Sequence, residues 1–217
     1  REYGIRSALP ISKAWQFSEA ARKAGKPPAV FLPPNSRRYA EISERIMAIL
    51  HAHAALVEKA SIDEAYMDMS LLETYRKARA IAKKIKDEIR AKEHLTASIG
   101  IGPNKLIAKI ASDSQKPDGL TVVTDEEAEA FLEQLSIRTI PGIGPKTEVQ
   151  FLKLGVKTVR DAKNFNREEL YDQFGKWGIE LYDTLRGVSD SPITEFYEAK
   201  SIGEQETFAE DTIDAVQ

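Results

Sequence analysis

Apolar residues recur at helical spacing in two long stretches in the first half of the chain. The clearer stretch covers residues 72–92, where one face carries Ala78, Ile81, Ala82, Ile85 and Ile89. Charged residues fill the other positions, as in a helix with one solvent-facing side. A second helix is predicted from Asn35 or Ser36, either of which can cap it, to about His53. A shorter helix is predicted over residues 12–24.

Shorter apolar runs between these helices predict β-strands. Strands are expected over residues 29–32, 95–101 and 119–123, and residues 56–68 are expected to form a hairpin. Another helix, capped by Asn104, is predicted between the last two strands. From residue 125 onward the pattern is wholly helical, in short pieces separated by glycine. The order predicts an α+β fold, with a mainly antiparallel sheet, helices on one face and a small all-α region after it.

Composition limits the class of protein. The chain has 217 residues, of which 42% are hydrophobic and 30% charged, and none of its apolar runs approaches the ~20 residues of a membrane span. It contains no cysteine, which excludes disulfides and Cys-ligated zinc and fits a cytoplasmic protein. The three histidines are expected to be structural, because they lie in or beside helical patterns.

Charge is distributed unevenly along the chain. The net charge is −3, but residues 195–217 carry seven acids against one lysine, or −6, which leaves +3 for residues 1–194. A mildly basic body with an acidic end allows a polyanionic partner without requiring one.

Two adjacent carboxylates, Asp63 and Glu64, follow the apolar run at residues 56–62. Neighbouring side chains in a strand point to opposite faces, whereas at a turn both can converge on one point. Paired carboxylate oxygens of this kind suit Mg²⁺, which is held by one or two carboxylates together with substrate phosphates. The alternative is a charged surface turn, which is the commoner use of an isolated Asp-Glu pair.

A Gly-x-Gly turn between short helices is the second informative feature. Gly142 and Gly144 permit tight backbone geometry, and Pro145 suits the first position of a helix. The helix N-terminus, with Lys146 and Thr147, would face an anion. The pattern resembles a helix-hairpin-helix, a module that binds the nucleic-acid backbone without reading sequence. The alternative is a plain helical corner that needs glycine for its turn.

Two details qualify this hairpin. Glu148 follows the turn, and its negative charge is expected to weaken phosphate binding slightly. Residues 171–178 look like a weaker second copy, in which Trp177 is expected to be a core residue rather than a base-stacking platform.

Lysines accompany the helix that Asn104 caps. Lys105 and Lys109 are four residues apart and share one helix face, and Lys116 lies in a Lys-Pro-Asp-Gly turn. A lysine on such a loop can bind phosphate oxygens as a point charge. Taken singly, each lysine is expected to be a solvent-exposed charge.

Together these features resemble the Y-family (lesion-bypass) DNA polymerases of the DNA polymerase IV type. The resemblance extends over essentially the whole chain and depends on the order and spacing of its motifs. These motifs are Ser61-Ile62-Asp63-Glu64-Ala65-Tyr66, Gly100-Ile101-Gly102, Asn104-Lys105-Leu106, Ala108-Lys109, Lys116-Pro117-Asp118-Gly119, Pro141-Gly142-Ile143-Gly144 and Ser201-Ile202-Gly203.

The resemblance implies an arrangement of domains. A palm with metal carboxylates is followed by a small helical thumb that carries the helix-hairpin-helix. The implied ranges are the end of the fingers at 1–34, the palm at 35–124, the thumb at 125–190, a linker at 191–200 and the start of the little finger at 201–217.

The resemblance also implies the chemistry of a template-directed DNA polymerase. Asp63 and Glu64 would hold two Mg²⁺ ions, and Arg1 and Lys116 would contact the triphosphate. The thumb turn, with Gly142, Gly144, Lys146 and Thr147, would hold the DNA backbone. The implied partners of this monomer are primer-template DNA and deoxynucleoside triphosphates, with a sliding clamp as a further candidate through regions outside the chain.

Departures from the family pattern lie at both ends. The family's Asp-x-Asp motif, with another metal ligand and the steric gate, would precede Arg1, and most of the little finger would follow residue 217. We therefore expect this piece alone to be inactive. Two other functions stay open, namely another palm-type two-metal enzyme such as a nucleotide cyclase, and a non-catalytic DNA-binding protein.

Overall fold

The computed structural model describes residues 2–196 and 201–203. The chain divides into two compact units, residues 1–39 and 40–217, which are described separately below. Arg1 lies outside the described residues, as do residues 204–217, which make up most of the expected start of the little finger.

The first unit contains one helix and an extended segment beside it. The predicted helix is confirmed as α1, Ile11–Lys23. The strand predicted over residues 29–32 is wrong, because these residues lie outside any strand. The segment is tied to α1 by a side chain instead. The buried hydroxyl of Ser18 accepts a hydrogen bond of 2.9 Å from the Ala29 backbone N–H.

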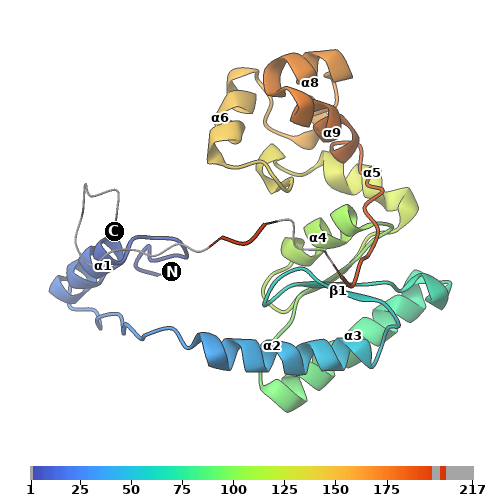
Figure 1. Cartoon of the computed structure of the whole chain (residues 1–217). Helices are drawn as coiled ribbons and strands as arrows, with labels where there is room; N and C mark the ends of the chain where they lie inside the picture. The colour runs from blue at the N-terminus through green and yellow to red at the C-terminus, as the bar shows by residue number, and fades with distance from the viewer. Residues whose placement is uncertain (1, 197–200, 204–217) are drawn as a thin grey trace. The chain divides into compact units, whose positions relative to one another are not determined.

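Two long helices form one side of the palm region (Figure 1). They are α2, Ser36–His51, and α3, Tyr75–Glu93, close to their predicted bounds. Asn35 caps α2 by accepting a hydrogen bond of 3.0 Å from the Arg38 N–H. Both helices contribute to one apolar core with the first strand. Its buried members are Met47, Ile49, Leu50, Val57, Ile85 and Ile89.

The predicted hairpin is confirmed. Strand β1, Val57–Lys59, pairs antiparallel with β2, Ala65–Met67, so that Glu58 lies opposite Tyr66. A short 3₁₀ helix, η1, Ser70–Leu72, follows. Because neighbouring residues of a strand face opposite ways, the hairpin has an apolar side and a polar side. Val57 contributes to the palm core, while Glu58 on the other side contacts α4.

The second pair of strands differs from the expected sheet. Strand β3, Ile99–Ile101, and strand β4, Leu120–Val122, pair in parallel, with α4, Lys105–Ser114, between them in the chain. A helix returns the chain to the starting end of the sheet, so the next strand runs in the same direction as the one before it. The described strands are thus one antiparallel and one parallel pair, rather than a mainly antiparallel sheet.

Helices also cover both sides of β3, whereas one covered face was expected. Ile99 packs against the core under α2 and α3, while the next residue, Gly100, faces α4. Figure 1 shows α2 and α3 on one side of the strands and α4 on the other. The α+β class with a helical region after it is confirmed.

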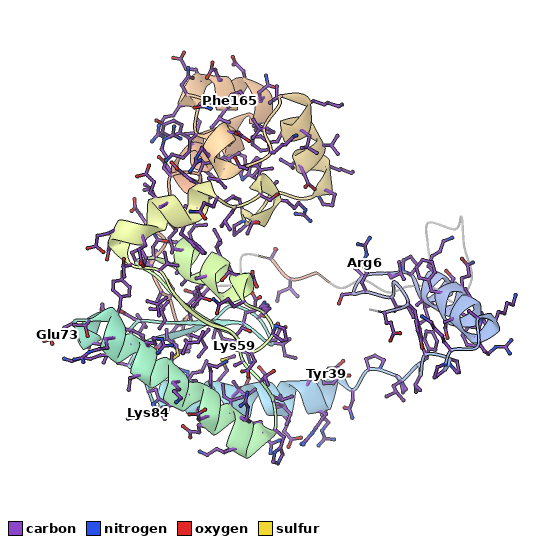
Figure 2. The ribbon with its side chains drawn as sticks, turned by 180° about the vertical axis from the view of Figure 1, so that it is seen from behind. Arg6, Tyr39, Lys59, Glu73, Lys84 and Phe165 are labelled. Carbon is purple, nitrogen blue, oxygen red and sulfur yellow. The ribbon has the colours of Figure 1, made fainter. Side chains whose placement is uncertain are left out.

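The region after residue 125 is helical, as predicted. Its elements are α5 Asp125–Glu133, η2 Ile137–Thr139, α6 Pro145–Lys153, α7 Val159–Ala162, α8 Arg167–Phe174 and α9 Lys176–Thr184. They enclose a core that includes Phe151, whose ring centroid is 4.7 Å from that of Phe174. The side chains of this region, with Phe165 labelled, are drawn in Figure 2.

The thumb core continues into the palm without a break. Ile107 and Ile110 of α4 belong to the same buried cluster as Leu132. Asn104 caps α4, because its side-chain oxygen accepts a hydrogen bond of 3.0 Å from the Ile107 N–H. Its amide nitrogen donates a hydrogen bond of 2.8 Å to the Gly187 carbonyl at the end of the thumb. The division near residue 125 therefore stays a prediction. Among the described helices, none is long and apolar enough to cross a membrane.

Candidate active site

The two carboxylates lie in the turn of the β1–β2 hairpin. Ser61 organises this turn, because its hydroxyl oxygen accepts hydrogen bonds from the backbone N–H groups of Asp63 (3.2 Å) and Glu64 (3.0 Å). The Ser61 hydroxyl also donates a hydrogen bond of 2.8 Å to the Asp63 carboxylate. The Glu64 carbonyl closes the loop by accepting from the N–H groups of Ala60 and Ser61. The turn therefore holds both carboxylates on adjacent residues at one end of the hairpin.

The polar side of the hairpin faces two lysines of α4. Lys105 donates to both carboxylate oxygens of Glu58, each at 2.7 Å, and its ammonium lies 4.8 Å from the centroid of the Tyr66 ring. Burial, helped by Glu64 and Glu58, raises the pKa of Tyr66 despite the opposing effect of the two lysines. Lys105 is only 13% exposed at its side chain, so the expectation that it is solvent-exposed is wrong.

Lys109, one turn along α4, binds Glu64. Its ammonium donates to the Glu64 carboxylate and lies 3.6 Å from Asp113. Burial alone would lower the pKa of Lys109, but the hydrogen bond to Glu64 and the charge of Asp113 outweigh it and raise that pKa. Asp113 also pairs with Lys116 at 2.5 Å. An alternating row of charges thus connects a predicted metal ligand to the predicted triphosphate lysine.

The turn that carries Lys116 is fixed from α3. The Lys86 ammonium donates to the Asp118 carboxylate at 2.6 Å and to the carbonyls of Ala97 (2.5 Å) and Gly119 (3.1 Å). The hydrogen bond from Lys86 and the charges of Lys86 and Arg90 hold the pKa of Asp118 below its usual range. Lys86 therefore ties α3 to the start of both β3 and β4.

The linker segment is attached to the same side of the palm. The buried Glu58 carboxylate accepts a hydrogen bond of 2.9 Å from the Thr194 N–H. The Lys105 ammonium donates a hydrogen bond of 3.3 Å to the Pro192 carbonyl. The pair formed by Glu58 and Lys105 thus holds the chain after the thumb against the β1–β2 hairpin.

The thumb turn has the geometry expected of a helix-hairpin-helix. Gly142 has φ of +88°, a conformation that favours glycine, and Ile143 between the two glycines is buried in the core. Gly144 precedes α6, and a Cβ added to it would meet no atom within 4 Å. Lys146 is exposed and Thr147 is partly buried in the first turn of α6. The four residues predicted to bind DNA are therefore grouped at one exposed helix N-terminus.

The expected penalty from Glu148 is reduced by a neighbour. Its carboxylate lies 3.6 Å from the guanidinium of Arg138, which also donates to the Ile143 carbonyl. Arg138 therefore offsets part of the negative charge beside the turn and supports the turn backbone at the same time.

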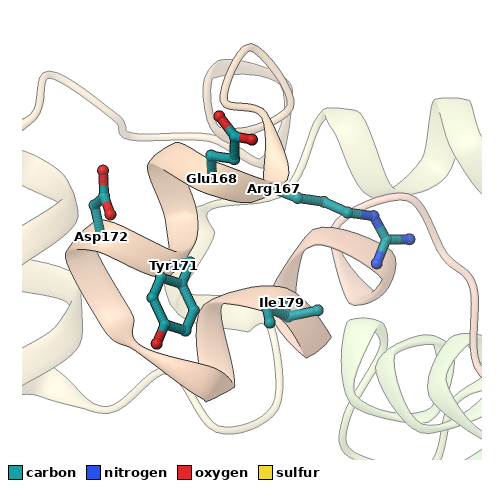
Figure 3. A pocket seen from close by; sticks show the side chains of 5 residues that line it. All are labelled: Arg167, Glu168, Tyr171, Asp172 and Ile179. Carbon is teal, nitrogen blue, oxygen red and sulfur yellow. The ribbon is translucent and has the colours of Figure 1, made fainter.

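The weaker second hairpin, residues 171–178, brings α8 and α9 into close contact. A Cβ on Gly178 would stand 2.0 Å from the Leu170 carbonyl oxygen, so α8 and α9 pack backbone to backbone. Trp177 is partly buried against the thumb core, which confirms the prediction. A hollow of about 380 Å³ on these helices is lined by Arg167, Glu168, Tyr171, Asp172 and Ile179 (Figure 3). It contains none of the predicted site residues.

The donor atoms of the hairpin turn fit a hard divalent cation. Asp63 is exposed, and both residues offer carboxylate oxygens, the ligands that Mg²⁺ takes together with substrate phosphates. Glu64 already has a cationic partner in Lys109, which shows that this position stabilises positive charge. Groups of three or more His, Asp or Glu side chains placed to hold a metal are absent from the described part of the chain.

Two protein-family models match this chain, one in each half. A model described as the impB/mucB/samB family matches residues 1–113, and one described as the DNA polymerase-iota thumb domain matches residues 138–189. The chain belongs to the impB/mucB/samB family.

Curated relatives of this impB/mucB/samB chain include two proteins named DNA polymerase IV. DNA polymerase IV 2 of Methanosarcina mazei is 42% identical over 218 residues, which covers 100% of this chain and 57% of the relative. DNA polymerase IV of Nitrosopumilus maritimus is 43% identical over 198 residues, covering 90% of this chain and 53% of the relative. The chain thus spans about half the length of these curated relatives.

Solved structures agree with this family assignment. The crystal structure of DinB from Sulfolobus solfataricus superposes with a TM-score of 0.80 at 35% identity, covering 89% of this chain and 55% of that one. An insertion ternary complex of Dbh DNA polymerase gives a TM-score of 0.79 at 35% identity, with the same coverage. The resemblance to Y-family polymerases of the DNA polymerase IV type is confirmed.

The structure places some of the predicted site residues and shows contacts that the sequence did not predict. Asp63 and Glu64 lie together in the predicted hairpin, while Arg1 lies outside the described residues. Sequence reasoning missed Lys109 as the partner of Glu64 and Asp113 as the partner of Lys116. The i,i+4 spacing of Lys105 and Lys109 was the available signal, but it did not identify the carboxylates they face.

Proposed function

We propose that the full-length protein carrying this chain is a translesion DNA polymerase that adds deoxynucleotides to a primer 3′ end. The observation that carries the proposal is the pair Asp63 and Glu64 on one tight hairpin turn, in a chain 42% identical to a DNA polymerase IV. The match to a polymerase thumb over residues 138–189 favours this function over a nucleotide cyclase.

Asp63 and Glu64 are the proposed ligands of two Mg²⁺ ions. When bound, such ions lower the pKa of the primer 3′-hydroxyl and neutralise charge on the leaving pyrophosphate. Ser61 would keep both carboxylates oriented toward the reacting groups, since it fixes the backbone N–H groups of both residues. Lys116 and Arg1 would supply positive charge to the β and γ phosphates.

The thumb turn is the proposed contact with the primer-template duplex. The backbone N–H groups near Gly142 and Gly144, together with Lys146 and Thr147, would bind phosphates without reading sequence. A monomeric state, a cytoplasmic location and a sliding clamp as a further partner stay predictions.

Primer extension by the full-length protein tests the proposal. Asp63→Asn should lower the extension rate by at least about 100-fold, because the carboxylate that holds the ions is removed while the turn keeps its shape. Lys84→Ala is the control, since Lys84 is exposed on α3 (Figure 2) and takes part in none of the hydrogen bonds described above for the turn. Wild-type protein that does not extend a primed template would contradict the polymerase function.

Gel shifts with the same proteins separate polymerase from simple DNA binding. Asp63→Asn should bind primed DNA about as well as wild type while failing to extend it. Equal extension by the variant and the wild type would mean that Asp63 has no catalytic part, whereas a non-catalytic DNA-binding protein predicts that both proteins bind the DNA and neither extends the primer.

A further inference from the structure

Four charged side chains form a continuous row from the hairpin turn to the Lys116 turn. The Lys109 ammonium hydrogen-bonds Glu64 and lies 3.6 Å from Asp113, which in turn pairs with Lys116 at 2.5 Å. The two central side chains come from one helix, α4, at i,i+4 spacing. Two lysines therefore share the one carboxylate of Asp113, and one of those lysines also holds a proposed metal ligand.

Lys109 and a divalent cation would compete for the same carboxylate. An ammonium in hydrogen-bond contact with Glu64 repels a divalent ion that approaches the same oxygens. Lys109 is 26% exposed at its side chain and has a second anionic partner on its own helix, so it can change partners without losing its charge compensation.

We propose that Lys109 and Asp113 are positioning residues that couple metal binding at Glu64 to the release of Lys116. The proposal rests on the function proposed above. Without metal, Lys109 is the counterion of Glu64. When Glu64 takes a divalent cation, Lys109 moves to Asp113, the Asp113–Lys116 pair weakens, and the Lys116 ammonium becomes available to an anionic phosphate.

The direction of this exchange follows from the charges. Asp113 carries one negative charge and cannot fully compensate two ammonium groups at close range. Lys109 lies 3.6 Å from Oδ2 of Asp113 and Lys116 lies 2.5 Å from Oδ1, so drawing Lys109 closer places two ammonium groups on one carboxylate, and their mutual repulsion weakens the Lys116 contact. Thermodynamic linkage makes the effect reciprocal, so binding of a phosphate to Lys116 would favour metal at Glu64.

Lys105 provides an internal control on the same helix face. It is bound to buried Glu58, which lies in β1 rather than in the carboxylate turn and also accepts a hydrogen bond from the Thr194 N–H, and the Lys105 side chain is 13% exposed. Its environment should stay constant when metal binds.

The test is an NMR titration of the full-length protein, labelled with ¹³C at the lysine ε-carbons, with Mg²⁺ alone as the probe. Single Lys→Arg variants assign the signals. The signals of Lys109 and Lys116 should shift with the same midpoint, and that of Lys105 should not. In Lys109→Met the Lys116 signal should no longer respond, and Lys109→Arg should restore the response.

Metal affinity gives a second readout. Lys109→Met should bind Mg²⁺ about threefold to fivefold more tightly, the range expected for a partly exposed ion pair. Weaker binding in this variant would overturn the competition between Lys109 and the metal. A Lys116 signal that still shifts in Lys109→Met would overturn the coupling.

Failure of this coupling can be told apart from failure of the proposed function. Mg²⁺ binding that Asp63→Asn weakens, with a Lys109 signal that stays fixed, would leave the polymerase proposal standing and overturn only the exchange. Mg²⁺ binding that Asp63→Asn leaves unchanged would contradict the metal site itself, and the exchange with it.

Discussion

Gly100 of β3 and Ala108 of α4 are in direct backbone contact. A Cβ added to Gly100 would stand 2.0 Å from the Ala108 carbonyl oxygen and 2.3 Å from the Ser112 nitrogen. Only a residue without a side chain lets α4 approach the strand this closely. The approach matters for the site, because α4 carries both Lys105 and Lys109 to the carboxylates of the hairpin.

The first prediction concerns this contact. Gly100→Ala should lower the free energy of unfolding by about 3 kcal/mol, because backbone atoms of α4 must move to admit the methyl group. Urea unfolding of the 217-residue chain measures the change. Gly203→Ala is the matched control, since nothing lies within 4 Å of that position, and it should change stability by less than about 0.5 kcal/mol. Equal stability of both variants would contradict the close packing.

The second prediction concerns the buried pair of Glu58 and Lys105, whose side chains are 5% and 13% exposed. Glu58→Gln should cost about 3 kcal/mol of unfolding free energy, because it leaves the Lys105 ammonium buried without its counterion. Adding Lys105→Met should recover much of that loss. Denaturant unfolding of the single and double variants measures both effects.

A surface pair gives the control for this cycle. Glu73→Gln removes the partner of Lys77, a pair 2.9 Å apart whose side chains are 76% and 54% exposed. It should cost less than about 0.5 kcal/mol. A double variant as unstable as Glu58→Gln alone would mean that the unpaired lysine does not cause the destabilisation.

The parts of the site that sequence predicted are those made by neighbouring residues. The hairpin turn depends on Ser61, Asp63 and Glu64, which are consecutive or nearly so, and the thumb turn depends on Gly142 and Gly144. Local turn chemistry determines such features, so a short stretch of sequence contains the information.

The parts that sequence missed depend on contacts between distant residues. Glu64 and Lys109 are 45 residues apart, and Glu58 and Thr194 are 136 apart. The segment 29–32 was predicted as a strand from its apolar residues, but a strand also needs a partner, which the pattern of one segment cannot supply. Strand direction in the β3–β4 pair likewise depends on the connection rather than on either strand.

The third prediction concerns pH. Lys86, through its hydrogen bond, and Arg90 keep the pKa of Asp118 below its usual value, so ionised Asp118 stabilises the folded chain. That contribution should be fully present above the unfolded pKa of about 3.9, and it should be lost as pH falls through the lower folded pKa. The measurement is urea unfolding of wild type and Asp118→Asn at a series of pH values.

The difference in stability between these two proteins should therefore be constant at neutral pH and shrink only in acid. Asp172→Asn is the control, because Asp172 is exposed and has no ion-pair partner among the residues that the structure describes. A difference that grows as pH falls below about 4 would mean that Asp118 is not stabilised in its charged form.

The last prediction concerns DNA binding by the thumb turn. Lys146 is exposed in the first turn of α6, beside the open backbone at Gly144. If it neutralises one phosphate, Lys146→Ala should reduce the slope of log Kd against log salt by about 0.9, equally for duplexes of unrelated sequence. Fluorescence anisotropy between about 50 and 200 mM salt measures this slope.

Lys84→Ala is the control for this measurement. It removes the same charge from the exposed face of α3, so it should leave the slope unchanged. Identical slopes for all three proteins would show that the α6 N-terminus does not contact the DNA backbone, whereas equal loss in both variants would mean that overall charge, not this turn, controls binding.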